Sequence, residues 1–283
     1  MPKLEAFWDD ISVFHSALLP PHAEKVMAIF GNRGFYWPRW DFATLPYWDS
    51  FYDIEPVTRT LRKYVDFASI ARAEVKLAVT ATDIASGEIM AFSNADPTNP
   101  LTMDHLVASG SLPPSYPAKT IGEVAYWDGG LFDNTPLSAL LDLVDAADAA
   151  TTRVIVVNLF PKTGTIPHTM LDVWDRMTEL QFANKTEKDV KLAQTINKLV
   201  AVIEKLSEER GESVLQGDDF KGLAKYKAFD NIIPIINNSP EPVSSSSDFS
   251  RDSIKRRIDA GYRAAAAALA HAPKSLAKLK AAI

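Results

Sequence analysis

The chain has 283 residues, of which 47% are apolar and 23% charged, a composition typical of a globular protein with a substantial core. Its 30 Lys and Arg against 36 Asp and Glu give a net charge of −6, which excludes a general basic surface for nucleic acid. There is no Cys, which excludes disulfides, Cys-ligated zinc, iron–sulfur clusters and a thiol nucleophile.

Features that would target the chain to a membrane are missing from its sequence pattern. No apolar run reaches the ~18 residues of a membrane-spanning helix. The start, MPKLEAFWDD, has one Lys followed by acidic residues, unlike a signal peptide. The five His are scattered without metal-ligand spacing. We therefore expect a cytoplasmic protein with no metal and no cofactor.

The amino-terminal part predicts a helix, a long aromatic loop and a β-hairpin. Apolar residues at helical spacing favour a helix over 4–15. Residues 30–51 are crowded with aromatic side chains and interrupted by Gly and Pro, which indicates an irregular loop. Alternating residues over 74–82, and a return over 89–93, predict two hairpin strands.

The aromatic loop at 30–51 allows two interpretations. Its side chains could form a lid that faces lipid, or they could anchor a long loop onto the body of the protein. We favour anchoring.

The middle of the chain predicts an α/β architecture. A short helix is expected over 101–108, a strand over 123–127 and a helix over 136–149. The apolar run at 153–160 is typical of a strand buried on both faces in a parallel sheet. Strand, helix and strand in this order predict a βαβ unit.

The carboxy-terminal part of the sequence has a mainly helical pattern, unlike the segments before it. Helical periodicity over 169–210 indicates two helices, and 229–236 reads as a further strand. A serine-rich polar loop at 241–248 precedes a terminal helix over 250–271. The basic residues after His271 are expected to form a solvated end, although such a tail can also contact anionic lipid.

The most informative residues for chemistry are Asp128, Gly129 and Gly130, at the end of the predicted strand 123–127. Ligands of open α/β sheets bind at that edge, and a glycine turn would aim the carboxylate into the crevice. As an isolated motif, Asp-Gly-Gly is also ordinary turn chemistry. His105 lies near this part of the sequence, and we expect it to be a helix residue bonded locally.

Three motifs together resemble the patatin-like phospholipase family, in its bacterial soluble branch. They are ASGSLPPSYP, YWDGGLFDNTPL and, near the end, DFSRDSIKRRIDAGYRAA. The resemblance implies hydrolysis of lipid acyl esters by a serine–aspartate dyad, hence a role in lipid degradation. It makes Asp128 the base, with Gly129 and Gly130 allowing its approach to the serine. It also implies a glycine-rich loop that stabilises the oxyanion.

The sequence departs from the family pattern at the nucleophile. It contains no GxSxG elbow, and Gly31 to Gly34 is the nearest approach to a glycine-rich loop. Ser109 and Ser111 follow a helix rather than a strand, so we expect them to be small packing residues. The chain therefore resembles the rear part of a patatin-like hydrolase, with the base but without the nucleophile half, and alone we expect it to be inactive.

The resemblance also sets the expected fold. It implies a three-layer α/β/α arrangement with a mostly parallel sheet, incomplete at the front, plus a carboxy-terminal helical extension. Residues 1–165 would form the rear part of the α/β domain, including the aromatic loop. Residues 166–283 would form the helical extension, with one further strand and a terminal helix.

Three functions stay open. The chain can be part of an acyl-lipid hydrolase, a non-catalytic lipid-binding or scaffold protein derived from the patatin fold, or a remnant without its own function. Its expected partners are an acyl-lipid substrate once the enzyme is completed, a membrane surface, and either a missing amino-terminal segment or a second copy that covers unpaired strands. Translation of the DNA upstream of Met1 discriminates these functions, since an in-frame GxSxG favours the enzyme.

Overall fold

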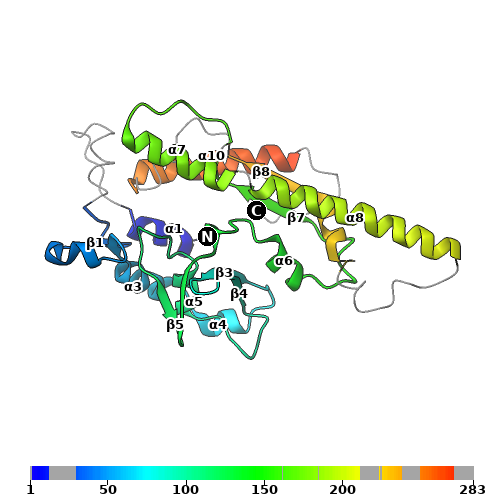
Figure 1. Cartoon of the computed structure of the whole chain (residues 1–283), viewed down its shortest axis with the longest axis horizontal. Helices are drawn as coiled ribbons and strands as arrows, with labels where there is room; N and C mark the ends of the chain where they lie inside the picture. Colours follow the sequence, from blue (N-terminus) through cyan, green and yellow to red (C-terminus); the bar gives the residue numbers. More distant parts are fainter. Residues whose placement is uncertain are drawn as a thin grey trace. The chain divides into compact units, whose positions relative to one another are not determined.

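The computed structural model describes residues 2–12, 30–160, 162–183, 185–210, 223, 225–237 and 249–270. The chain divides into two compact units, whose elements are drawn in Figure 1. The first consists of Met1–Asn134 with Ser244–Ile258, and the second of Thr135–Val243 with Asp259–Ile283. The domain limits expected from the sequence, 1–165 and 166–283, stay a prediction.

The first unit contains a four-stranded sheet in which every neighbouring pair is antiparallel. Its order is β4 (Ile89–Ser93), β3 (Ala78–Asp83), β6 (Val124–Asp128) and β5 (Lys119–Ile121). The predicted hairpin is confirmed as β3 and β4, with Thr80 opposite Ala91. The register of β3 with β6 places Ala81 opposite Asp128, at the end of β6.

The same unit contains the helices α1 (Pro2–Asp10), α3 (Glu55–Tyr64), α4 (Phe67–Ala71) and α5 (Met103–Ala108). The helix α5 packs against β3, β5 and β6. Apolar side chains from the helix and the sheet are buried between them: Ala81, Phe92, Leu101, Ala108 and Tyr126. This core holds the end of β6 in place.

The aromatic segment is only partly anchored. It contains two short strands, β1 (Trp37–Pro38) and β2 (Tyr52–Asp53), which pair antiparallel, and the 3-10 helix η1 (Phe42–Tyr47). Tyr36 is buried, as anchoring requires. The side chains on and around η1 are exposed, so the expectation that the whole segment is anchored is wrong for them.

In its described residues, the second unit is helical with one pair of strands. Its elements are α6 (Leu137–Leu143), β7 (Val154–Asn158), α7 (Met170–Ala183), α8 (Lys185–Arg210), the 3-10 helix η4 (Lys225–Asn231) and β8 (Ile232–Ile236). The strands β7 and β8 pair in parallel. Helix α10 (Arg251–Ala270) contributes residues to both units.

The mixed α/β class is confirmed, but the strand pairing differs from the expected mostly parallel sheet. Parallel pairing among the described strands occurs only between β7 and β8. The expected βαβ unit is wrong, because β6 pairs antiparallel with β3 and β5, whereas β7 belongs to a different sheet. Burial of β7 on both faces is also wrong: Val154 and Val156 are buried in a core cluster, while Ile155 and Val157 are exposed.

None of the helices in the described ranges has the length and apolar character needed to cross a bilayer. The predicted serine-rich loop at 241–248 and the basic tail after His271 lie outside the described residues.

Candidate functional site

The candidate site is built on Asp128, the last residue of β6. Its backbone N–H donates to the carbonyl oxygen of Ser111 at 3.0 Å. Its own carbonyl accepts a hydrogen bond from the Thr82 hydroxyl at 3.2 Å. The main chain of Asp128 is therefore fixed from both sides, by the neighbouring strand β3 and by the segment that follows α5.

The two glycines after Asp128 form a turn that leaves no room for a side chain at the first position. A Cβ added to Gly129 would lie 2.7 Å from both the carbonyl carbon and the carbonyl oxygen of Thr80, which is shorter than real contacts allow. Gly129 is thus required for the close approach of the turn to β3. At Gly130, the nearest atom to an added Cβ is the Asp128 Oδ1, at 3.1 Å.

The carboxylate of Asp128 is held by the turn that it starts. The Gly130 N–H donates to Asp128 Oδ1 at 2.7 Å. This hydrogen bond favours the charged carboxylate and lowers its pKa, whereas burial acts in the opposite direction and is the larger effect. As a result, the pKa of the Asp128 carboxyl is raised to about 6. A carboxylate with this pKa can accept a proton near neutral pH.

The segment ASGSLPPSYP lies beside Asp128, since the Ser111 carbonyl oxygen accepts the Asp128 N–H. Ser111 is fully buried, and its hydroxyl donates to the carbonyl oxygen of Val107 at 2.9 Å. Ser109 forms the carboxy-terminal cap of α5, and its backbone N–H bonds to the His105 carbonyl oxygen. The expectation of a packing residue is confirmed for Ser111, which is buried, whereas for Ser109, which is half-buried at the end of α5, it stays a prediction.

His105 is a structural residue of α5, as expected. It is buried, and its ring stacks on Phe92 with the ring centroids 4.1 Å apart. Its Nδ1 accepts a hydrogen bond from the Thr102 backbone N–H at 3.0 Å, which caps the helix. Burial lowers the pKa of the ring, so the neutral form that the cap needs is favoured.

Asp133 lies beyond the glycine turn and differs from Asp128 in its surroundings. Its backbone N–H donates to the Gly129 carbonyl oxygen at 2.9 Å, which closes the turn.

The loop from Gly31 to Gly34, the nearest approach to a glycine-rich oxyanion loop, is a tight turn packed on α1. Its amides at Asn32 and Gly34 bond to the Tyr36 carbonyl oxygen and to the Asn32 side chain. These amides are therefore used within the turn.

The sequence pattern does not single out Thr80 and Thr82, two residues of β3. Thr80 lies against Gly129, and the Thr82 hydroxyl donates to the Asp128 carbonyl oxygen. Both lie in a strand that was predicted, and both are buried. The missing information was the register, because only the pairing of Ala81 with Asp128 brings these threonines to the turn. Polar residues inside an otherwise apolar strand were the available signal.

Comparisons with known proteins agree with the motifs. A family model described as patatin-like phospholipase matches residues 3–141, and one described as patatin phospholipase matches residues 180–280. No curated protein matches the chain. The Asp128 turn lies inside the first matched range, and all of α8 and α10 lie inside the second.

Proposed function

The chain belongs to the patatin-like phospholipase family, a family of lipid acyl hydrolases, and we propose that Asp128 is the general base of such an enzyme. The observation that carries the proposal is the half-buried carboxylate at the end of β6, with its pKa raised to about 6. Asp128 is positioned by contacts to Ser111 and Thr82, none of which uses its second carboxylate oxygen.

The proposed reaction is a two-step acyl transfer. Asp128 accepts the proton of a serine hydroxyl while the serine oxygen attacks the ester carbonyl carbon of the lipid. The proton then passes to the oxygen of the departing alcohol as the acyl–oxygen bond breaks. In the second step, Asp128 takes a proton from water, whose oxygen attacks the carbonyl carbon of the acyl-serine. The bond to the serine oxygen then breaks as Asp128 returns the proton to that oxygen, and the fatty acid is released. The base ends in its starting form.

We assign the nucleophile to residues outside the printed sequence. That sequence contains no GxSxG, and the Ser111 hydroxyl is buried and bonded to the Val107 carbonyl oxygen. The printed chain alone should therefore show no turnover of p-nitrophenyl esters above background. Turnover that disappears in Ser109→Ala or Ser111→Ala would contradict this assignment.

The test of the base uses the chain joined to a GxSxG segment found by reading the DNA in frame upstream of Met1. Asp128→Asn should lower kcat/KM by about 10²–10⁴ or more, because the amide cannot accept the serine proton. Asn keeps the shape of the side chain and can still accept the Gly130 N–H, so the turn should persist. The matched control is Asp133→Asn, which should leave hydrolysis nearly unchanged. Loss of hydrolysis in Asp133→Asn, with activity retained in Asp128→Asn, would overturn the proposal.

A non-catalytic lipid-binding protein is the second candidate. The observation that favours it is the exposure of apolar side chains around η1, which would serve lipid binding without any reaction. A DNA reading with stop codons and no separate gene for the nucleophile segment would support this second function.

A further inference from the structure

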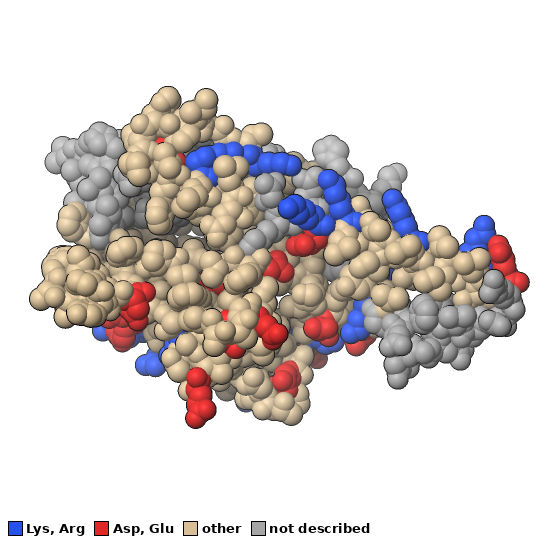
Figure 2. Space-filling model, in the orientation of Figure 1, with Lys and Arg blue, Asp and Glu red and all other residues tan. Residues whose placement is uncertain are grey.

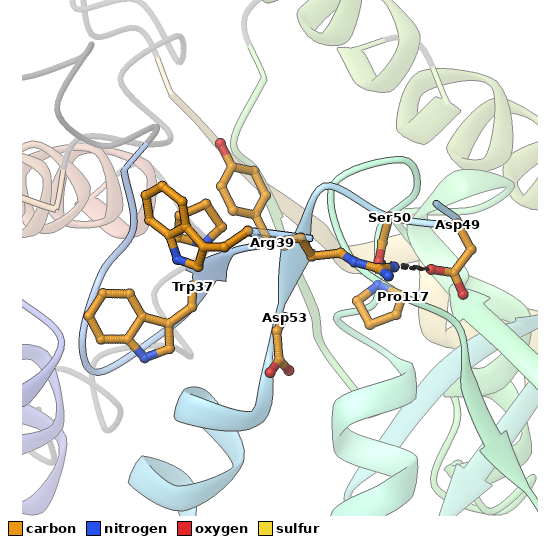
Figure 3. A pocket seen from close by; sticks show the side chains of 9 residues that line it. Trp37, Arg39, Asp49, Ser50, Asp53 and Pro117 are labelled. Atoms are coloured by element: carbon orange, nitrogen blue, oxygen red, sulfur yellow. Dashed lines mark hydrogen bonds and ion pairs between the residues drawn. The ribbon is translucent and has the colours of Figure 1, made fainter. Parts of the chain in front are cut away.

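The first unit contains a pocket of about 700 Å³ around the strands β1 and β2, within the size range of small-ligand sites. None of Asp128, Gly129 or Gly130 lines it. Six of the side chains that form its wall are labelled in Figure 3, and all nine are Trp37, Pro38, Arg39, Trp40, Asp49, Ser50, Tyr52, Asp53 and Pro117. The pocket thus combines aromatic rings with two carboxylates and one guanidinium.

The guanidinium of Arg39 is already neutralised. It pairs with Asp41 at 2.9 Å and with Asp49 at 3.1 Å, and it lies 5.1 Å from the centre of the Trp48 ring. Figure 3 shows Arg39 extended toward Asp49, with the ion pair drawn as a dashed line. An anionic ligand such as a phosphate would have to displace these carboxylates, so Arg39 does not make the pocket an anion site.

Asp53 is the carboxylate of the lining whose negative charge is available to a ligand. Its carboxylate accepts the backbone N–H of Glu55 at 2.9 Å, at the start of α3, and it forms no ion pair with a described residue. In Figure 3 it points away from the Arg39 guanidinium. With two carboxylates against one paired guanidinium, the lining favours a cationic ligand.

The aromatic rings of the lining indicate which type of cationic group the pocket would bind. Trp37, Trp40 and Tyr52 all line the pocket, and Pro38 and Pro117 add apolar surface. Aromatic faces attract cations, most of all quaternary ammonium groups, which lose little hydration on entering such a site. The rings supply no acceptor for the N–H groups of a primary ammonium, so they favour the quaternary group, whereas the Asp53 carboxylate attracts either cation.

The surroundings of the pocket point to the source of this cation. We define the aromatic ridge as Trp40, Phe42, Leu45 and Tyr47, on and beside η1. All four are exposed, Tyr47 to 88%. Figure 2 shows uncharged side chains over the near face of η1, at the left of the view, whereas the exposed carboxylates of Asp41 and Asp49 flank this helix and pair with Arg39. Exposed aromatic residues of this kind are typical of the boundary between lipid and water.

Trp40 belongs to both features, because it lines the pocket and is part of the ridge. Its ring contacts Phe42, with the centroids 6.1 Å apart. The pocket therefore opens beside apolar side chains that can enter a lipid surface. In a bilayer of choline phospholipid, the trimethylammonium groups lie at the water side of the interface, above the glycerol and acyl region that exposed aromatic side chains can enter.

We propose that this pocket binds the trimethylammonium group of a choline phospholipid while the aromatic ridge enters the lipid surface. The inference rests on the proposed function in one respect, that lipid is the substrate class. The backbone connects the two sites: Ser111 bonds to Asp128, Ser115 bonds to Tyr52, and Pro117 lines the pocket. The site would hold the enzyme on its substrate surface.

The first experiment measures cosedimentation of the full chain with phosphatidylcholine vesicles. Asp53→Asn keeps an oxygen that can accept the Glu55 N–H but removes the charge, and Trp37→Leu removes the ring. Each should weaken binding by about 3- to 30-fold, the range expected for the loss of one cation–π or charge contact. Asp142→Asn, an exposed carboxylate on α6, is the matched control and should bind like the parent.

The second experiment separates a lipid headgroup from free choline. Choline chloride, followed by tryptophan fluorescence, should bind the parent and the ridge variant Tyr47→Ser alike, and Asp53→Asn weakly. Vesicle binding should fall in Tyr47→Ser but not in Tyr262→Ser, which changes the same type of residue at an exposed position on α10. Choline binding without vesicle binding would overturn the lipid assignment.

Two results would overturn the pocket assignment. One is parent-like binding of phosphatidylcholine vesicles by both Asp53→Asn and Trp37→Leu. The other is tighter binding of phosphatidylglycerol or phosphatidylethanolamine vesicles than of phosphatidylcholine at the same ionic strength. Vesicle binding requires no turnover, so a failure of this inference and a failure of Asp128 as the base are measured separately.

Discussion

The Asp128 turn and the aromatic ridge belong to the same unit but relate differently to its packing. In the turn, the backbone amides of Asp128, Gly130 and Asp133 are all hydrogen-bonded, and Gly129 touches β3 without room for a Cβ. On the ridge, four large apolar side chains remain exposed to solvent. Contacts within the unit therefore account for the residue types of the turn. They do not account for large apolar side chains on the ridge, where exposed patches of this kind are typical of binding surfaces.

The largest expected effect is that of Gly129→Ala. The added Cβ would lie 2.7 Å from backbone atoms of Thr80, which cannot move without shifting β3. We expect destabilisation by about 3 kcal/mol or more. Thermal unfolding followed by circular dichroism measures this loss.

Gly130→Ala is the matched control for that variant. Its Cβ would meet the Asp128 side chain at 3.1 Å and the Asn134 side chain at 3.6 Å, and side chains can adjust more easily than backbone. A loss of stability as large as that of Gly129→Ala would show that the contact with β3 is not what constrains the turn.

A smaller effect is expected from Asp128→Asn on stability, and it depends on pH. Burial raises the pKa of the folded carboxyl to about 6, above its ordinary value of 3.8, so the native state binds the proton more tightly than the unfolded chain does. The carboxylate thus costs stability that accumulates as the pH rises from about 4 to 6 and is constant above. Asp128→Asn removes this cost. Because the side chain is only half-buried, we expect a gain of about 1 kcal/mol, or ~2–4 °C in Tm, at pH 8.

The same comparison made at pH 4 is the control for Asp128→Asn. There the parent carboxyl is protonated in the folded protein, so parent and variant should melt at nearly the same temperature. An equal gain at both pH values would mean that the effect has nothing to do with the charge of Asp128.

The smallest effect is expected on the ridge. Phe42→Ser removes an apolar side chain that is 61% exposed, so the free energy of unfolding should change by no more than about 0.5 kcal/mol. Chemical denaturation measures it. A loss of several kcal/mol would show that the ridge packs against part of this protein, and the difference between the two regions would disappear.

The sequence predicted most elements whose pattern is local. The hairpin β3–β4, the capped helix α5 and the strand β6 followed by a glycine turn all lie close to their expected places. Asp128 was found because glycines and a strand end are visible in the sequence itself. The close contact of Gly129 with Thr80 then gives the motif a steric reason.

Features that depend on distant pairing could not be predicted in the same way. The order of strand, helix and strand suggested that β6 and β7 share a parallel sheet, but β6 pairs antiparallel with β3 and β5. Local sequence does not specify which strands meet. The burial of Tyr36 and the exposure of Tyr47 likewise depend on tertiary contacts, although both residues lie in one aromatic run.

The protonation of Asp128 tests the central claim most directly, because it needs neither a nucleophile nor a substrate. Carbon-13 NMR of the aspartate carboxyl groups, followed as a function of pH, would give the pKa of each group. A resonance that titrates near pH 6 and is absent from Asp128→Asn is the predicted result. A pKa of Asp128 at or below 3.8, the ordinary value of an aspartate, would contradict its assignment as the base, since such a carboxylate would be an ordinary turn cap.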